Sequence, residues 1–334
     1  MDRRKFIQAS SLLGLGVGLG ADSLAFSGNI PAGRRVGMIG LDTSHSIEFV
    51  KALNAKDAGN AFDGYTITIA YPYGSRDIES SYSRIEGYTK TVREFGVKIA
   101  ASIDEVIAGS DVIMLETNDG KLHLEQALPV FKSGKRIFID KPVAARYQDV
   151  VKIFKASQQY KTPFFSASSL RYVENLAAIR NGSLVGKVLG AETYSPAVLE
   201  PSHTDLYWYG IHGVEMLFTA MGTGCATVSR IHVPDTDVAV GAWKDGRLGT
   251  FRGTRTGRHK YGGIAFGENG NIHISEYSGY KPMLLEIIKF FNTGIVPVDP
   301  GETLEIYAFM EAADESKKQG GRPVALQPYL DMIK

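Results

Sequence analysis

The sequence is poor in cysteine and nearly neutral, and each of these shortages excludes a class of protein. A single cysteine, Cys225, occurs among 334 residues, so no disulfide bond can form within the chain. We expect Cys225 to be a small core residue, because no accompanying histidine pattern marks it as a nucleophile. The 37 lysines and arginines nearly balance the 36 acidic residues, so a net charge of +1 offers no electrostatic footprint for nucleic acid or an anionic membrane. We therefore expect a small-molecule partner.

Long hydrophobic runs are also missing from the sequence. The apolar stretch near its start, 12–19, falls far short of the ~20 residues that span a bilayer. Arg3-Arg4-Lys5-Phe6 precedes this stretch, and Ser23-Leu24-Ala25 follows it. This order of charged, apolar and small residues is typical of a secretory signal, and the paired arginines resemble the twin-arginine class. We predict a cleaved signal over 1–25 and a periplasmic chain without a membrane anchor; an amphipathic first helix is the alternative.

A linker with glycine and proline, over 26–34, precedes an alternating series of strand and helix patterns. The strand-like apolar runs lie at 35–40, 65–70, 97–100, 111–115 and 136–139. This alternation predicts βαβ units and a parallel sheet over 35–155. Over 156–334, strands joined by turns such as Asp245-Gly246 predict an α+β domain with a mostly antiparallel, open-faced sheet. The expected fold class is therefore α/β with two domains.

The first strand ends in a glycine turn of the kind that opens a Rossmann-like dinucleotide-binding domain. In such turns the glycines let the backbone approach a pyrophosphate at the amino terminus of the next helix. The turn reads Gly40-Leu41-Asp42-Thr43-Ser44-His45, so Asp42 stands at the second glycine position and brings a carboxylate towards the pyrophosphate charge. Thr43 and Ser44 can cap the helix or donate hydrogen bonds to a phosphate. These are the first candidate cofactor-binding residues, and a purely structural turn explains them equally well.

An ordered series in the second half of the same domain is more specific. It consists of Thr117-Asn118, His123, Ala127, Gly134-Lys135 and Asp140-Lys141-Pro142. The series resembles the segment of the Gfo/Idh/MocA oxidoreductase family that runs from Thr-Pro-Asn through His, Ala-Leu and Gly-Lys to Glu-Lys-Pro. Asp140 replaces the family's glutamate, and the proline after Thr117 is absent. Fainter similarity extends over about 35–327.

The resemblance implies a nicotinamide-dependent oxidoreductase. The residues that it places at the cofactor are Thr117, Asn118, His123, Asp140, Lys141 and Pro142. It makes Lys141 catalytic, since a lysine at a strand's carboxyl end can hydrogen-bond the substrate oxygen and favour its alkoxide. His212 matches the family's histidine and would be the general base. A surface lysine at a turn and a structural helical histidine are the respective alternatives.

The second domain also departs from the family pattern. Trp208 stands where the family has an acid four residues before the histidine, and the nearest upstream acid is Asp205. Arg171-Tyr172 resembles the family's crossing into the second domain. The expected substrate contacts are Arg171, Tyr172, Asp205, Trp208, Tyr209 and His212. Trp208 and Tyr209 would form an aromatic wall for a sugar-like ring, and a core role explains them equally well. By analogy with the family, we expect a homo-oligomer paired through the open face of the second sheet.

The choice of nucleotide depends on the end of the second strand, where no acid is available for the ribose of NAD. Ser75 and Arg76 follow instead and favour NADP through its 2′-phosphate; a surface loop is the alternative. No metal site is predicted, because the histidines and Asp42 lack the short spacings of zinc sites. A meeting of Asp42 and His45 with His212 across the cleft is a minor alternative.

Three hypotheses follow from these observations. The leading one is a periplasmic NAD(P)-dependent oxidoreductase that transfers a hydride to or from a hydroxyl-bearing carbon of a sugar or polyol. Because the periplasm has no nicotinamide pool, we expect the cofactor to be tightly held. A sugar-binding protein that kept the fold without the chemistry is the first rival, favoured by Asp42 and Trp208. A cofactor-independent or metal-assisted lyase or hydrolase in the same cleft is the second.

Overall fold

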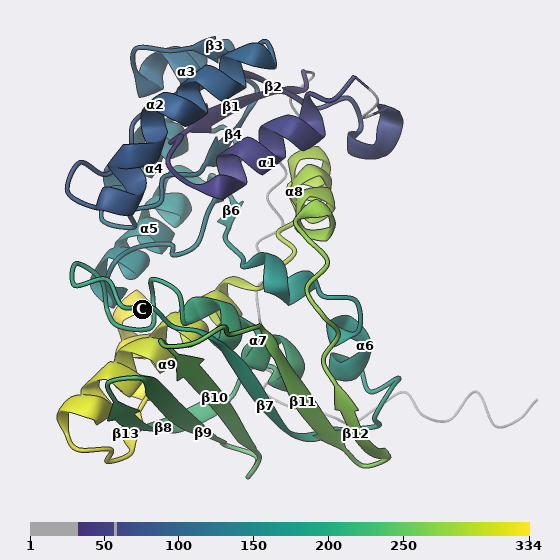
Figure 1. Cartoon of the computed structure of the whole chain (residues 1–334), viewed down its shortest axis with the longest axis vertical. Coiled ribbons are helices and arrows are strands. Elements are labelled where there is room, and N and C mark those ends of the chain that lie inside the picture. Colours follow the sequence, from purple (N-terminus) through teal and green to yellow (C-terminus); the bar gives the residue numbers. More distant parts are fainter. Residues whose placement is uncertain (1–32, 57–58) are drawn as a thin grey trace, which may run out of the picture.

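The computed structural model describes residues 33–56 and 59–334. The predicted signal over 1–25, and all but the last two residues of the predicted linker, lie outside the described residues. The described part forms two layered units, one above the other in Figure 1, and each is built on one sheet. No helix within that part is long and apolar enough to cross a membrane.

The first sheet is parallel throughout and has the strand order β3-β2-β1-β4-β5-β6. Its strands are β1 (Arg35–Ile39), β2 (Thr66–Tyr71), β3 (Lys98–Ile99), β4 (Val112–Leu115), β5 (Ile137–Ile139) and β6 (Phe164–Phe165). The central strands are continuous runs of buried Val, Ile, Leu and Met, because helices cover both faces of the sheet. In this order β1 lies between β2 and β4, where the direction of strand succession reverses and ligands bind in open α/β sheets.

Helices pack on both faces of this sheet. They are α1 (Ser44–Leu53), the short η1 (Gly59–Phe62), α2 (Glu79–Glu94), α3 (Ile103–Gly109), α4 (His123–Ser133) and α5 (Tyr147–Tyr160). Alternate residues of β1 divide between the faces: Val36 and Met38 pack in the cluster with α1, whereas Ile39 packs in the cluster with α3, α4 and α5. The first face also takes α8 (Lys281–Thr293), a helix from far along the chain, which lies beside α1 in Figure 1.

The second sheet has seven strands in the order β12-β11-β7-β10-β9-β8-β13. They are β7 (Val188–Pro196), β8 (Cys225–Val233), β9 (Thr236–Trp243), β10 (Leu248–Thr254), β11 (Gly262–Gly267), β12 (Gly270–His273) and β13 (Val324–Ala325). Its ladders are antiparallel except for that between β7 and β10. The expected α/β fold with a second, mostly antiparallel sheet domain is confirmed.

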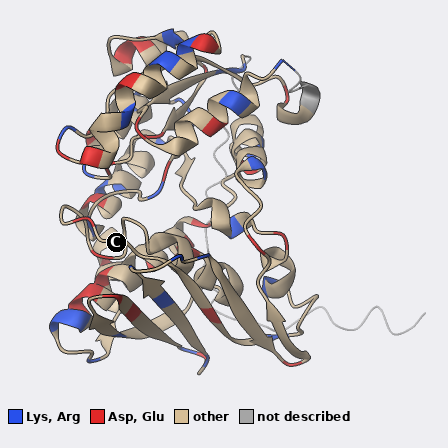
Figure 2. Cartoon of the chain, viewed as in Figure 1, with Lys and Arg blue, Asp and Glu red and all other residues tan. Residues whose placement is uncertain are grey.

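One face of the second sheet is covered and the other is open. The covering helices are α7 (Ile211–Met221) and α9 (Pro300–Lys318), and the remaining elements are η2 (Ser169–Tyr172), α6 (Leu176–Arg180), α10 (Gln327–Leu330) and η3 (Asp331–Ile333). On β10 the buried Phe251 faces the helices, and Leu248, on the other face, is 57% exposed. Charged residues of both signs are interspersed along the helices in the view of Figure 2.

The two units share a continuous apolar core rather than meeting at a polar interface. Ile113 and Ile139 of the first sheet belong to the same buried cluster as Val214 of α7 and Phe251 of β10. Cys225, at the start of β8, is buried in that cluster, as expected, and burial raises the pKa of its thiol to about 12. Because the two units share this core, the carboxyl ends of β1, β4 and β5 are packed firmly against the second domain.

Candidate active site

A cavity of about 180 Å³ lies where the carboxyl ends of the parallel strands meet the second domain. The first domain contributes Thr43, Ser44, His45, Arg84, Asn118 and Lys141 to its lining. The second contributes Ser169, Leu170, Tyr209, His212, Tyr261, Tyr277 and Tyr280. Seven of the residues singled out from the sequence thus meet in one place, namely Thr43, Ser44, His45, Asn118, Lys141, Tyr209 and His212.

Lys141 and His212 reach this cavity from different domains. Lys141 follows β5 directly, and His212 lies in the first turn of α7; both are almost fully buried. Burial, followed by the positive charge of Lys141, holds the pKa of His212 well below its usual value. The imidazole is therefore neutral at pH 7 and able to accept a proton, beside a lysine able to stabilise an anion.

The position of His212 is set by Ser168 and by a buried ion-pair network. Its Nδ1 lies 2.7 Å from the Ser168 Oγ, and the Ser168 backbone N–H donates to Glu215 at 2.7 Å. The guanidinium of Arg171 pairs with the carboxylate of Glu215 at 2.6 Å and with that of Glu302 at 2.7 Å. This one side chain therefore holds η2, α7 and α9 together. Arg171 was expected at the substrate, and the structure places it in this network behind the cavity wall.

Other residues singled out from the sequence also lie outside the cavity lining. Asp205 pairs with Arg230 at 2.9 Å and with Lys317 at 2.7 Å. Trp208 packs on His203, with ring centroids 5.0 Å apart. Tyr172 is largely buried beside the network, and burial raises the pKa of its phenol. The aromatic wall of the cavity comes instead from Tyr209 with three tyrosines that the sequence analysis missed, Tyr261, Tyr277 and Tyr280.

His123 and the β2–α2 loop hold the edge of the first sheet together. His123 is fully buried, with Nε2 2.7 Å from the carbonyl oxygen of Thr117 and Nδ1 3.1 Å from that of Val143, so it lies between two turns and can donate its one N–H to either. Ser75 donates its hydroxyl to Asp77 or Asp119, at 2.8 and 2.7 Å. These two carboxylates oppose a 2′-phosphate at Ser75, so the preference for NADP loses its support.

Arg76 and Pro142, also named from the sequence, are not part of the cavity lining. The Arg76 guanidinium lies over the ring of Tyr73, 5.6 Å from its centroid, and this contact engages its planar face. Pro142 follows Lys141 and is joined to it by a cis peptide bond. Neither side chain adds a polar group to the cavity.

Asp42 links the loops that flank β1. Its buried carboxylate accepts the backbone N–H of Asn118 at 2.9 Å and that of Ser75 at 3.3 Å. Burial is the main reason why the pKa of Asp42 rises to about 6, with the two hydrogen bonds acting in the opposite direction. A Cβ on Gly74 would lie 2.3 Å from Asp42 Oδ2, so glycine is needed there for the loop to approach the carboxylate.

The turn after β1 suits a dinucleotide at two of its three defining features. Gly40 has a φ of +92°, and a Cβ there would lie 2.4 Å from the Thr117 nitrogen, so only glycine allows the two turns to approach. The amino terminus of α1, capped by Thr43, opens into the cavity, where its N–H groups favour a phosphate. The third feature, the second glycine, is Asp42. The residues present fit a nicotinamide dinucleotide, whose pyrophosphate must approach this carboxylate.

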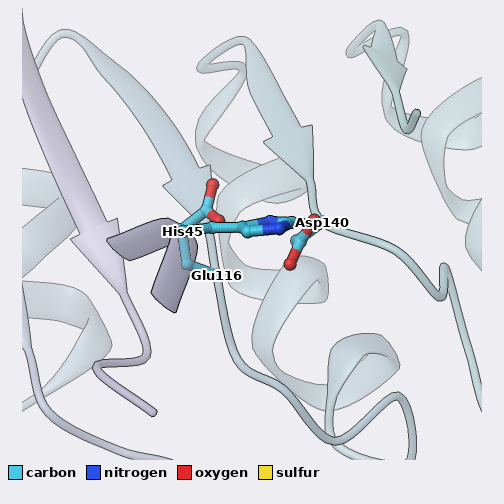
Figure 3. A group of neighbouring side chains, drawn as sticks. All are labelled: His45, Glu116 and Asp140. Atoms are coloured by element: carbon cyan, nitrogen blue, oxygen red, sulfur yellow. Dashed lines mark hydrogen bonds and ion pairs between the residues drawn. The ribbon is translucent and has the colours of Figure 1, made fainter. Parts of the chain in front are cut away.

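Three buried side chains form a cluster at the carboxyl edge of the first sheet. His45 in α1, Glu116 directly after β4 and Asp140 directly after β5 place potential ligand atoms within 4.8 Å of one another (Figure 3). His45 Nδ1 lies 2.9 Å from Asp140 Oδ1. Burial, and then the Asp140 charge, raises the pKa of Glu116 well above its usual value. The sequence analysis missed Glu116, although an acid that ends the apolar run Val112–Leu115 was a usable signal.

Comparisons with known proteins agree with this geometry. Residues 34–167 match the family GFO_IDH_MocA, described as an oxidoreductase family with an NAD-binding Rossmann fold. An uncharacterized oxidoreductase of Streptococcus pneumoniae serotype 4 is 27% identical over 152 residues, which is 41% of this chain and 41% of that protein. The chain therefore aligns with less than half the length of this curated relative.

Similarity to solved structures extends over both domains. Myo-inositol 2-dehydrogenase from Lactobacillus plantarum aligns with a TM-score of 0.69 at 17% identity, covering 87% of this chain and 98% of that one. Apo scyllo-inositol dehydrogenase from Lactobacillus casei aligns at 0.69 and 14%, covering 88% and 98%. GenD2 from gentamicin A biosynthesis, solved in complex with NAD, aligns at 0.68 and 14%, covering 87% and 95%. At these identities the similarity establishes the fold.

Replacement of Asp42 by asparagine tests the electrostatics of the turn. The folded pKa, about 6, exceeds the ordinary 3.8, so ionisation of Asp42 destabilises the fold progressively as the pH rises from about 4 through 6. Asp42→Asn should therefore gain stability relative to the unmodified chain by up to about 3 kcal/mol between pH 4 and pH 8. Urea unfolding of both proteins at the two pH values measures this difference.

Asp77→Asn is the matched control for this experiment. Hydrogen bonds from Lys121 and Ser75 hold the pKa of Asp77 down at about 2, so loss of its charge should remove stability above pH 4, the opposite sign. Stability curves for Asp42→Asn that run parallel to those of the unmodified chain at every pH would contradict the account of Asp42.

Proposed function

We propose that this chain is a member of the Gfo/Idh/MocA oxidoreductase family, whose model matches residues 34–167, and that it transfers a hydride between NAD and a hydroxyl-bearing carbon of a sugar or polyol. The observation that carries this proposal is the convergence of Lys141 and His212 on one buried cavity from separate domains. One of these groups can hold an anion and the other can take a proton, which are the two tasks that oxidation of an alcohol requires.

The cavity supports a small polyhydroxylated substrate. Its volume of about 180 Å³ is below the ~300–1,000 Å³ of typical ligand sites, so it suits a single ring. Tyrosines 209, 261, 277 and 280 offer ring faces to the C–H surface of a sugar and hydroxyls to its oxygens. The phenols of Tyr209 and Tyr261 already lie 3.3 Å apart, within hydrogen-bond distance.

The proton follows a defined path in this mechanism. Neutral His212 removes the proton of the substrate hydroxyl, and its Nδ1 is oriented by the Ser168 hydroxyl. Lys141 donates a hydrogen bond to the same oxygen and stabilises the alkoxide that develops. Both side chains are screened from bulk water, which strengthens these interactions. The nicotinamide supplies the hydride acceptor when NAD is bound.

The residues that would hold NAD lie along the same edge. The Gly40 turn and the amino terminus of α1 would bind the phosphates, with Thr43, Ser44 and Asn118 as side-chain donors. We propose NAD rather than NADP because the Ser75 hydroxyl already donates to Asp77 or Asp119, and these carboxylates would repel a 2′-phosphate. Asp42 is the residue that opposes the pyrophosphate.

Removal of either proposed catalytic group tests the chemistry. Lys141→Met and His212→Gln should each lower kcat/KM by about 10²–10⁴-fold against whichever of a panel of inositols and hexoses is oxidised with NAD. NAD binding should be nearly unchanged, and Lys132→Met, a substitution at an exposed position, is the control. Since the pKa of His212 is depressed, kcat/KM should fall only well below pH 6.5 in the unmodified enzyme. Full activity of His212→Gln would overturn the role of base.

The pH dependence of NAD binding tests the contribution of Asp42. Protonation of Asp42 removes a charge that repels the pyrophosphate, so affinity should rise as the pH falls through about 6. In Asp42→Asn, affinity should be on the order of 10-fold higher at pH 8 and independent of pH. Titration calorimetry with NAD measures both. A chain that binds sugars but no dinucleotide at any pH would instead support a sugar-binding protein or a cofactor-independent lyase or hydrolase.

The proposal includes a periplasmic location, which rests on the predicted twin-arginine signal over 1–25. A signal of this class exports a folded chain, which is consistent with a cofactor loaded before export. Arg3→Lys with Arg4→Lys should leave the protein in the cytoplasmic fraction of a host that exports the unmodified chain.

We also propose a homo-oligomer, because Ile231 and Leu248 are exposed apolar side chains on the open face of the second sheet. Light scattering measures the oligomeric state.

A further inference from the structure

Next to the cavity, at the carboxyl edge of the first sheet, lies a set of side chains that hydride transfer does not use. His45 comes from α1, Glu116 from the end of β4 and Asp140 from the end of β5, so three separate turns converge there. Their potential ligand atoms lie within 4.8 Å of one another, and Figure 3 shows the three side chains grouped together. All three are buried, and Glu116 and Asp140 are fully excluded from solvent.

The carboxylate oxygens in this set lack partners. Within the described part of the chain, neither oxygen of Glu116 has a hydrogen-bond partner, and neither has Asp140 Oδ2. Buried polar atoms in folded proteins are almost always paired, and an unpaired buried carboxylate is among the costliest exceptions. Three orphaned oxygens that face one imidazole therefore require an occupant.

The local charges indicate the sign of that occupant. Glu116 and Asp140 lie near each other, with Asp42 as a further acid close to Glu116 and Lys141 as the neighbouring cation. Like charges so close together in a dry site repel strongly unless a cation lies between them. A divalent ion compensates the two carboxylates directly.

We propose that His45, Glu116 and Asp140 bind a divalent transition-metal ion at the carboxyl edge of the first sheet, next to the cavity that His45 lines. One imidazole nitrogen with two carboxylates is a donor set that suits Zn²⁺, Mn²⁺ or Fe²⁺, whereas Mg²⁺ and Ca²⁺ prefer oxygen alone. The 2.9 Å between His45 Nδ1 and Asp140 Oδ1 is close to the separation of two ligands at right angles that are each ~2.1 Å from one ion, and tetrahedral zinc would need the two atoms to move slightly apart. No zinc site was predicted from the spacing of the histidines, because two of these ligands are carboxylates from other turns.

Packing holds the imidazole in place. The His45 ring meets Tyr280 edge to face, with centroids 4.7 Å apart, and lies 5.9 Å from Phe49. His45 also lines the cavity with Lys141 and His212. Three protein ligands would leave coordination positions of the ion open, as in catalytic metal sites.

Metal content of the purified full-length protein tests the proposal without substrate or nicotinamide, so its result is independent of the proposed hydride transfer. Elemental analysis should find close to one equivalent of Zn²⁺, Mn²⁺ or Fe²⁺, or the chelator-treated protein should bind Zn²⁺ or Mn²⁺ with one-to-one stoichiometry in calorimetry. Metal should also raise the Tm of the chelated protein.

Glu116→Gln and Glu125→Gln form a matched pair, because Glu125 is an exposed acid on α4 in the same domain. Glu116→Gln should weaken metal binding by more than the ~10–100-fold that loss of an outer partner costs, and Glu125→Gln should not change it. With metal removed, Glu116→Gln should have a Tm close to that of the unmodified chain, since the amide has nearly the same shape as the carboxyl group, and this measurement also shows that the variant folds.

Two outcomes would overturn the proposal. One is a chelated, folded protein that binds none of the three ions up to millimolar concentration. The other is a Glu116→Gln variant that retains the affinity of the unmodified chain. In the first case a proton shared between Glu116 and Asp140 accounts for the cluster.

Discussion

Burial of charged side chains at the carboxyl edge of the parallel sheet is the constraint on which the rest of the site depends. Each turn leaves the sheet while still bonded to its neighbour: Gly40 N–H donates to Tyr71, Glu116 N–H to Ile39 and Asp140 N–H to Leu115. The side chains that follow are therefore fixed side by side and out of water. Every carboxylate at this edge needs a compensating group.

That need is met differently at each position. Asp42 takes two backbone N–H groups and thereby fastens the loops on both sides of β1. Asp140 takes the imidazole of His45. Neither carboxylate oxygen of Glu116 accepts a hydrogen bond from the described part of the chain. This unpaired buried carboxyl group distinguishes the edge from an ordinary phosphate-binding turn. Both proposed ligands would interact with these acidic side chains. The pyrophosphate of a dinucleotide would be repelled by Asp42, and a metal ion would be bound by Glu116.

The second domain supplies what the sheet edge lacks. Arg171 binds Glu215 of α7 and Glu302 of α9, and this network fixes the helix that carries His212. Because the two domains share one apolar core, the neutral His212 of one domain lines the same cavity as Lys141 of the other. Three tyrosines from the segment 261–280 then close the cavity.

Local patterns in the sequence predicted the strands and helices, the parallel and the antiparallel sheet, and the turn that begins at Gly40. Such patterns are visible in the sequence because strand and helix periodicity depend on neighbours along the chain. The series that ends in Asp140-Lys141-Pro142 carried the resemblance to the family whose model matches residues 34–167, and Lys141, singled out by that series, lines the cavity. Arg171 and Asp205 could not be assigned in this way, because their ion-pair partners Glu302 and Arg230 lie far away in the sequence. Trp208 packs on the nearby His203, a contact that strand and helix periodicity does not predict.

Only the tertiary structure decided how Asp42 is used and that Glu116 meets His45. Asp42 accepts hydrogen bonds from Ser75 and Asn118, 33 and 76 residues away, and Glu116 lies 71 residues from His45. These residues belong to different turns, and their contact depends on strand order and on the exclusion of water, neither of which leaves a periodic trace in the sequence.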